Sequence, residues 1–220
     1  KLLLFQPAQL LVQGSQALVN YGTNPVMAAA GSKDALMMLA GMAVRRVGNP
    51  TKFSNEMERL VGVIERSGYV ADVSTVDAIQ LASLKGGGGI SHIPQLTKSF
   101  VQTPFRYGET ANRVLAFATS RRVLMDRYTK GELKGLDGNT FRGAIDDDEF
   151  IRLTTERAKI LALNMGKAGQ LEAFSGAGSV LGQFKQVLPK ALHIFETDQL
   201  TAREKLGAAA VQLAFWGYAG

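Results

Sequence analysis

The sequence contains no cysteine, only two histidines and no apolar run long enough to cross a membrane. Without cysteine, disulfides, thiolate nucleophiles and thiolate metal ligands are all excluded. Disulfides would indicate an oxidising compartment, and because the chain can form none, its cellular compartment stays undecided. The longest apolar stretches begin at Ala35 and Leu206, and both are shorter than the ~20 residues that a membrane helix needs.

The composition is that of a packed protein with a moderate excess of positive charge. The chain has 220 residues, 46% of them hydrophobic, and a formal net charge of +6. We therefore expect a buried core and a preference for acidic partners such as nucleic acid or anionic lipid. Because the sequence begins at Lys1 and stops within an apolar run, we interpret it as a piece of a longer polypeptide.

Apolar residues recur at helical spacing along most of the chain, and no stretch shows the alternation of a strand. We predict an all-α, multi-helix fold of about eight helices, extended or bundle-like, with glycine-rich hinges. Helices are expected at residues 10–20, 32–46, 109–130 and 180–195, with others beginning near Asn49, Ser74, Asp146 and Thr201.

Several helix ends can be predicted from residue type. Asn49 and Pro50 are expected to cap and open one helix, which Gly68 ends. The sequence TARE at residues 201–204 is a capping box before the last apolar segment. Pro189 removes a backbone donor, so we predict a kink in the helix over residues 180–195.

Four consecutive glycines occupy the middle of the chain: Gly86, Gly87, Gly88 and Gly89. A phosphate-binding P-loop requires lysine and a hydroxyl residue after its glycines, but here Lys85 precedes them and Ile90 stands in the lysine position. We therefore predict a hinge. The chain is then divided into an N-terminal helical group at residues 1–85, a glycine-rich hinge and connector at 86–108, and a C-terminal helical group at 109–220.

The residues that usually carry catalysis or bind metals form no recognisable pattern. His92 and His193 are far apart in the sequence and lack partners at the spacing of a catalytic triad or a metal site. The acidic run from Asp146 to Glu149 suits a helix N-terminus, and we consider Mg²⁺ or Ca²⁺ binding the weaker alternative. We expect no catalytic residue, no metal and no cofactor in this segment.

Basic residues are frequent on and after the helix predicted at residues 109–130, and one of them, Arg121, lies within its apolar stripe. These residues are candidates for contacts with DNA phosphates. The candidates are Arg113, Arg121, Arg122, Arg127 and Lys130. The alternative, which we favour for direct contact, is a solvated helix face with interspersed acids.

The last helix is rich in small residues and ends in the aromatic residues Phe215, Trp216 and Tyr218. This composition suits close helix packing or an aromatic contact at a membrane interface. A buried helix of a bundle is the simpler interpretation.

The second half of the chain contains, in order, the segments TPFR, ANRVLAF, GQFKQ and LTAREKL, followed by an apolar end rich in glycine and alanine. In this succession residues 95–220 resemble helical portions of the large internal virion proteins of short-tailed bacteriophages, the core or DNA-ejection proteins, and of related phage polyvalent proteins. The resemblance implies a protein stored beneath the portal, expelled ahead of the genome and reassembled as an oligomeric tube across the host envelope. The glutamate motif of the lytic transglycosylase module that some members carry is not recognisable.

The resulting hypothesis is a structural virion segment without enzymatic activity, located in the virion interior and, after ejection, in the host cell envelope or periplasm. Its expected partners are copies of itself, other core, portal or tail proteins, and double-stranded DNA contacted without sequence preference. Contact with the host membrane stays open. Two other functions are also open: a non-catalytic helical region of a virion-packaged phage enzyme, such as an RNA polymerase or polyvalent enzyme, and a membrane-active helical protein.

Overall fold

The computed structural model describes residues 14, 17–47, 54–70, 95–162 and 194–216. These residues form helices and turns and contain no β-strand, which confirms the predicted all-α class. The helices are α2 (Pro25–Val47), α3 (Asn55–Arg66), α5 (Gln95–Thr129), α6 (Asp148–Leu161) and α8 (Ala202–Trp216), and residues 17–23 are helical as well.

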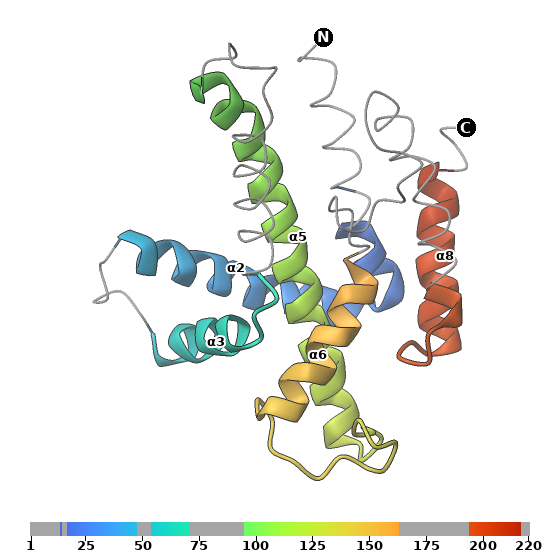
Figure 1. Ribbon diagram of the computed structural model, residues 1–220. Coiled ribbons are helices and arrows are strands. Elements are labelled where there is room, and N and C mark those ends of the chain that lie inside the picture. Colours follow the sequence, from blue (N-terminus) through green and yellow to red (C-terminus); the bar gives the residue numbers. More distant parts are fainter. Residues whose placement is uncertain (1–13, 15–16, 48–53, 71–94, 163–193, 217–220) are drawn as a thin grey trace, which may run out of the picture.

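The long helix α5 runs through the middle of the molecule, and the other helices are arranged around it (Figure 1). α2 crosses and packs against α5, α6 packs against α5 farther along, and α3 packs against α2. In the view of Figure 1, α3 and α8 lie on opposite sides of α5. α5 is therefore the helix against which both α2 and α6 pack.

α2 begins at an Asn-Pro pair that sequence reasoning overlooked. The Met27 amide donates to Asn24 Oδ1 at 3.1 Å, and Pro25 occupies the first helical position, where its missing N–H has no role. The helix therefore starts earlier than residue 32, where we predicted it. Gly31 lies inside the helix, and a Cβ added there would be 2.7 Å from the Thr119 backbone nitrogen. This glycine permits α2 and α5 to approach closely.

α3 begins later than predicted. Its N-cap is Ser54, whose side chain accepts a hydrogen bond from the Met57 amide at 3.2 Å, so the start predicted at Asn49 and Pro50 is wrong. The predicted end is confirmed, because Gly68 has a φ of 65° directly after the C-cap residue of the helix.

α5 begins earlier than the helix that we predicted at residues 109–130. It is continuous from Gln95 to Thr129, so residues 95–108 of the predicted connector belong to a helix that we expected to begin only at Glu109. Gly86–Gly89 lie outside the described residues. The physical reason for the error is that Pro104 and Gly108 are poor helix formers and interrupt the helical pattern.

The main core contains residues from both predicted helical groups. Its large buried side chains come from helices on both sides of the predicted connector: Met38, Leu60, Ile64, Phe117 and Leu161. A smaller cluster joins the end of α5 to the start of α6 and consists of Leu124, Leu133, Phe141, Phe150 and Leu153. The two groups therefore share one core among the described residues.

The segment between α5 and α6 is a turn region, as predicted from its glycines and aspartates. Gly131 and Gly138 adopt positive φ values, and Lys134 forms an isolated bridge with Thr140. α6 then starts at the predicted position. Its N-cap is Asp147, whose Oδ1 accepts a hydrogen bond from the Phe150 amide at 2.7 Å.

Candidate functional site

Buried arginine and carboxylate pairs join the described helices to one another. The first joins α5 to the turn that precedes α6. Arg121 Nε and Nη2 donate to Asp146 Oδ1 and Oδ2 at 2.7 and 2.6 Å, and the two side chains are 1% and 10% exposed. Such bidentate pairs are strong and directional. Arg121 was the charged residue noticed within an apolar stripe, and its partner explains that position.

The backbone of Asp146 is strained. Its φ of 69° is the only positive value among non-glycine residues of the described part, and the left-handed conformation costs about 1–2 kcal/mol in a non-glycine residue. Arg66 of α3 donates to the Asp146 carbonyl oxygen at 3.1 Å, while Arg59 Nη1 lies 3.9 Å from Asp146 Oδ2. α3, α5 and the start of α6 therefore meet at this one residue.

A second pair joins α2 to α5. Arg122 Nε and Nη2 both donate to the Asp34 carboxylate at 2.6 Å. The Asp34 side chain is 1% exposed and that of Arg122 is 33% exposed. The hydrogen bond from Arg122 to Asp34 raises the pKa of this guanidinium above its ordinary value. The negative charge of the buried Asp34 is therefore compensated by Arg122, which is partly exposed.

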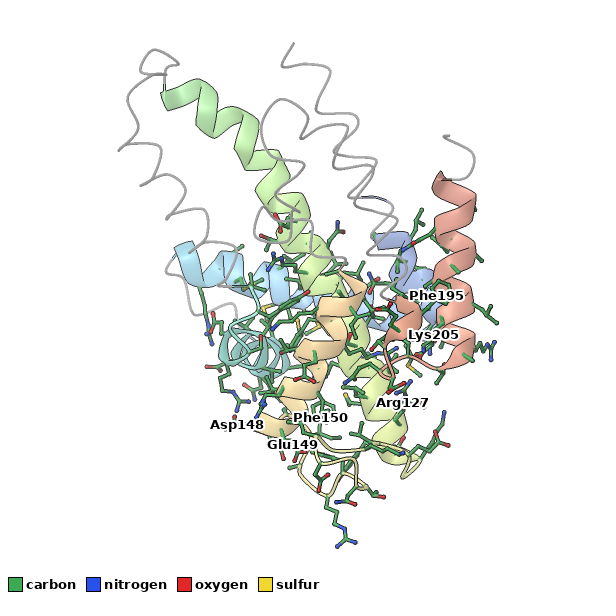
Figure 2. The ribbon with its side chains drawn as sticks, turned by 45° about the vertical axis from the view of Figure 1, so that its right-hand side comes forward. Arg127, Asp148, Glu149, Phe150, Phe195 and Lys205 are labelled. Carbon is green, nitrogen blue, oxygen red and sulfur yellow. The ribbon has the colours of Figure 1, made fainter. Side chains whose placement is uncertain are left out.

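In the third arrangement two arginines bind one carboxylate at the start of α8. Glu204 accepts from Arg127 of α5 at 2.9 Å and from Arg157 of α6 at 2.5 Å; Figure 2 labels Arg127 near the base of α8. Both arginines also donate to the Gln199 carbonyl oxygen, at 3.4 and 2.6 Å. The Arg157 side chain is fully buried, and burial lowers its pKa to about 10.

Glu204 also completes the predicted capping box, which the structure confirms. Its Oε2 accepts from the Thr201 amide at 2.8 Å, and the Glu204 amide donates to Thr201 Oγ1 at 3.3 Å. The sequence pattern identified this local role. It did not identify the two arginines, which are distant in the sequence.

Arg113 packs against Tyr69. Its Nη2 donates to Glu109 Oε1 at 2.9 Å and its Nη1 to the Tyr69 carbonyl oxygen at 3.4 Å. The guanidinium carbon lies 5.6 Å from the centre of the Tyr69 ring, a favourable cation–π distance. The Tyr69 hydroxyl donates to the Ala158 carbonyl oxygen at 3.1 Å, and burial raises the pKa of this phenol.

The structure places all five residues predicted to contact DNA in ion pairs with carboxylates of the same chain. The one pair not described above joins Lys130 to Asp126 at 2.6 Å. Arg113 and Arg121 are buried, so phosphate cannot reach them in this conformation. Lys130 is 56% exposed, and its DNA contact stays a prediction. Arg122 and Arg127 are partly exposed but are held by carboxylates.

The other predicted functional residues are not placed by the structure. Gly86–Gly89, Tyr218 and both histidines lie outside the described residues. Phe215 and Trp216 belong to α8, but their side chains also fall outside the description. Their roles as a hinge and as membrane or packing contacts stay predictions, as does the kink at Pro189.

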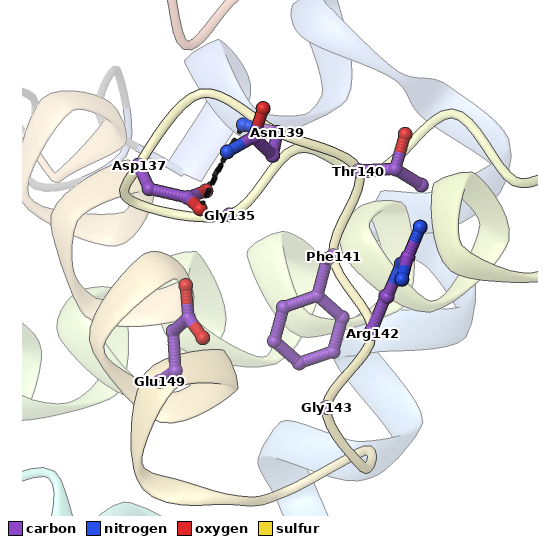
Figure 3. Close-up of a pocket in the computed structure, with 8 residues that line it drawn as sticks. All are labelled: Gly135, Asp137, Asn139, Thr140, Phe141, Arg142, Gly143 and Glu149. Atoms are coloured by element: carbon purple, nitrogen blue, oxygen red, sulfur yellow. Dashed lines mark hydrogen bonds between the residues drawn. The ribbon is translucent and has the colours of Figure 1, made fainter.

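A polar pocket of about 580 Å³ lies at the turn between α5 and α6 (Figure 3). Its carboxylates already have partners within the chain. Glu149 accepts from the Leu136 amide at 2.9 Å. Asp137 accepts from the backbone and side-chain nitrogens of Asn139 at 2.9 and 2.8 Å, and these hydrogen bonds lower its pKa. These hydrogen bonds hold the two carboxylates to the turn. Its lining residues are Gly135, Asp137, Asn139, Thr140, Phe141, Arg142, Gly143 and Glu149.

Within the part of the chain that the structure describes, no group of three or more histidine, aspartate or glutamate side chains is placed to hold a metal ion. No helix among residues 17–47, 54–70, 95–162 and 194–216 combines the length and apolar character of a membrane span.

Sequence reasoning missed two of the buried charges, Asp34 and Arg157. Arg157 lies four residues from both Leu153 and Leu161, on the buried side of α6. It therefore shows the same pattern as Arg121, a charge inside an apolar stripe. Asp34 is flanked by the buried Gly31, Ala35 and Met38, so it could have been found in the same way.

Comparison of the chain with models of protein families, with curated proteins and with solved structures finds no match.

Proposed function

We propose that this chain is a structural, self-assembling helical segment of an internal virion protein of the bacteriophage core or DNA-ejection type. Two observations support the proposal. The first is the resemblance of residues 95–220 described above. The second, which carries the assembly itself, is an apolar stripe on α2 that no other part of the described chain covers.

The α2 stripe consists of residues that are all exposed: Val26, Ala29, Lys33, Leu36, Ala40 and Ala43. Val26 is 71% exposed and Leu36 is 68% exposed. The residues are separated alternately by three and four positions, the spacing by which one helix packs along another in a coiled coil. The single lysine is compatible with this, because a lone polar residue in such a seam fixes register at some cost in stability.

The opposite face of α2 is already used. Ala28, Gly31, Ala35 and Met38 are buried, and α2 packs against both α5 and α3. α2 is therefore apolar on two sides, with only one side covered within the described chain. Large apolar side chains exposed along a helix favour an interaction surface, and we propose that a helix of a neighbouring copy packs there.

The test compares two leucine substitutions in the full 220-residue chain. Leu36→Glu places a charge in the α2 stripe, and Leu136→Glu places the same charge at an exposed leucine, 41% exposed, in the turn between α5 and α6. Size-exclusion chromatography with light scattering, at increasing protein concentration, measures the mass. We expect the unchanged protein and Leu136→Glu to associate and Leu36→Glu to stay monomeric.

The controls separate assembly from folding. Far-ultraviolet circular dichroism should give the same helix content for the three proteins, because both leucines lie at the surface. A strictly monomeric unchanged protein, or equal association of all three, would contradict the proposal.

Non-specific contact with double-stranded DNA is part of the same proposal, with the exposed basic residues as its carriers. Arg142, Arg152 and Lys159 are exposed on the turn and on α6. Contacts of this kind lose affinity steeply as salt concentration rises. Replacement of Arg152 and Lys159 by glutamine should weaken binding to unrelated DNA duplexes equally and reduce the salt dependence; unchanged binding would remove these residues from the proposal.

A further inference from the structure

The α8 side chains described by the structure bury little apolar surface. Among the α8 side chains that the structure describes, the buried ones are Glu204, Ala208 and Gln212, at 5%, 0% and 7% exposure, and Val211 is partly buried. Two of these four residues are polar, and the apolar two are small. Because hydrophobic stabilisation scales with the apolar area removed from water, these side chains hold α8 only weakly.

The contact between α8 and helical residues 17–23 is a close backbone approach. A Cβ added to Gly207 would lie 1.9 Å from the carbonyl oxygen of Gly22, and one added to Gly22 would lie 2.5 Å from Val211 Cγ2. Glycine is needed at both positions for this approach. The contact therefore fixes where α8 lies but contributes few apolar side chains.

The described ion pairs of α8 join Glu204 to two arginines. Arg127 comes from α5 and Arg157 from α6, so a single carboxylate joins α8 to both helices. Glu204 and Arg157 are almost completely buried. Removal of one member of such a buried pair leaves an uncompensated charge and is strongly destabilising.

We propose that α8 is a detachable helix whose docking on α5 and α6 is set by the charge of Glu204. Loss of that charge releases α8, while the core formed by α2, α5 and α6 stays folded. The main core supports this independence, because most of its large side chains come from α2, α3, α5 and α6. The inference concerns a single chain and does not depend on the assembly proposed above.

The experiment is hydrogen–deuterium exchange of the full chain, with Glu204→Gln as the central variant. Glutamine keeps the size of the side chain and an oxygen for the capping box but removes the charge. We expect the amides of α8 to exchange about 100-fold faster or more, and those of α5 and α6 to change by less than about twofold. Glu58→Gln, an exposed carboxylate on α3, is the matched control and should change neither.

Two results would overturn the inference. Unchanged exchange in α8 would mean that the charge does not hold the helix, and an equal increase in α5, α6 and α8 would mean that Glu204 stabilises the whole fold. If Glu204→Gln does not fold, the same exchange experiment is done with Arg127→Gln. The Arg127 side chain is 22% exposed. Faster exchange confined to α8 in that variant supports the inference, and equal acceleration in all three helices contradicts it.

Discussion

Asp146→Asn tests whether the buried pair between Arg121 and Asp146 holds the turn before α6. Asparagine has nearly the same shape as aspartate and tolerates the left-handed backbone conformation, so the φ of 69° can be kept. The substitution removes only the negative charge. Arg121, at 1% exposure, is then left without its counterion.

The expected loss of stability follows from the burial of both partners. Removal of one partner from a buried pair costs about 3–5 kcal/mol, and Asp146 is only 10% exposed, so water screens the pair little. One oxygen of asparagine can still accept a hydrogen bond from Arg121, which places the expected loss near the lower limit. For a chain of this length a loss near that limit corresponds to a melting temperature roughly 6–12 °C lower.

The assay is urea unfolding followed by far-ultraviolet circular dichroism, with Asp148→Asn as the matched control. Asp148 is 97% exposed and lies 3.9 Å from Arg66, so this change should alter the unfolding free energy by less than about 0.5 kcal/mol. The double variant Arg121→Met with Asp146→Asn should be more stable than Asp146→Asn alone, because no unpaired buried charge remains. The reasoning is refuted if Asp146→Asn and Asp148→Asn are equally stable.

Three other predictions concern helix contacts and titration. Gly31→Ala should destabilise the fold by about 1–3 kcal/mol, because its Cβ would meet the Thr119 backbone; urea unfolding measures the loss, and an unchanged midpoint would contradict the close contact. Asp147→Ala removes the α6 N-cap and should cost about 0.5–2 kcal/mol in the same assay, whereas no loss would show that the cap is dispensable. Burial raises the folded-state pKa of Tyr69 above the ordinary value of 10.0, so its contribution to stability is present below pH 10.0 and is lost as the pH rises through the folded-state pKa. Ultraviolet titration should find one tyrosine that ionises only in strong alkali or on unfolding, and Tyr69→Phe should abolish this late step.

The buried faces of the helices could be predicted from the sequence because helical periodicity is a local property. Phe117 and Leu124 of α5 and Phe150 and Leu161 of α6 belong to apolar series at helical spacing, and all four are buried. The start of α6 and the capping box at Thr201 were predictable for the same reason. In each case the residues that interact lie within one or two helical turns.

Helix starts were less predictable because the same dipeptide occurs in two contexts. Asn24 and Pro25 begin α2, but Asn49 and Pro50 do not begin α3, which starts after Ser54. Both sequences are compatible with an N-cap, and packing of the helix decides which cap is used. Local propensity cannot make that choice.

The ion pairs of the candidate site could not be assigned from the sequence. The partners of Arg121, Arg122 and Arg157 are 25, 88 and 47 residues away, and nothing local specifies them. The pattern could show only that a charge lay on an apolar face. The partner became known once the helices were placed relative to one another.

Neighbouring residues Arg121 and Arg122 project from α5 about 100° apart, as consecutive helical residues must, and their carboxylate partners belong to different segments of the chain. A turn of α5 about its own axis, or a slide along it by one residue, would break both bidentate contacts together. One dipeptide therefore fixes the rotational setting of the longest described helix. Insertion of a single residue into α5 between this dipeptide and Phe117 should be far more damaging than an insertion in the turn that follows Thr129.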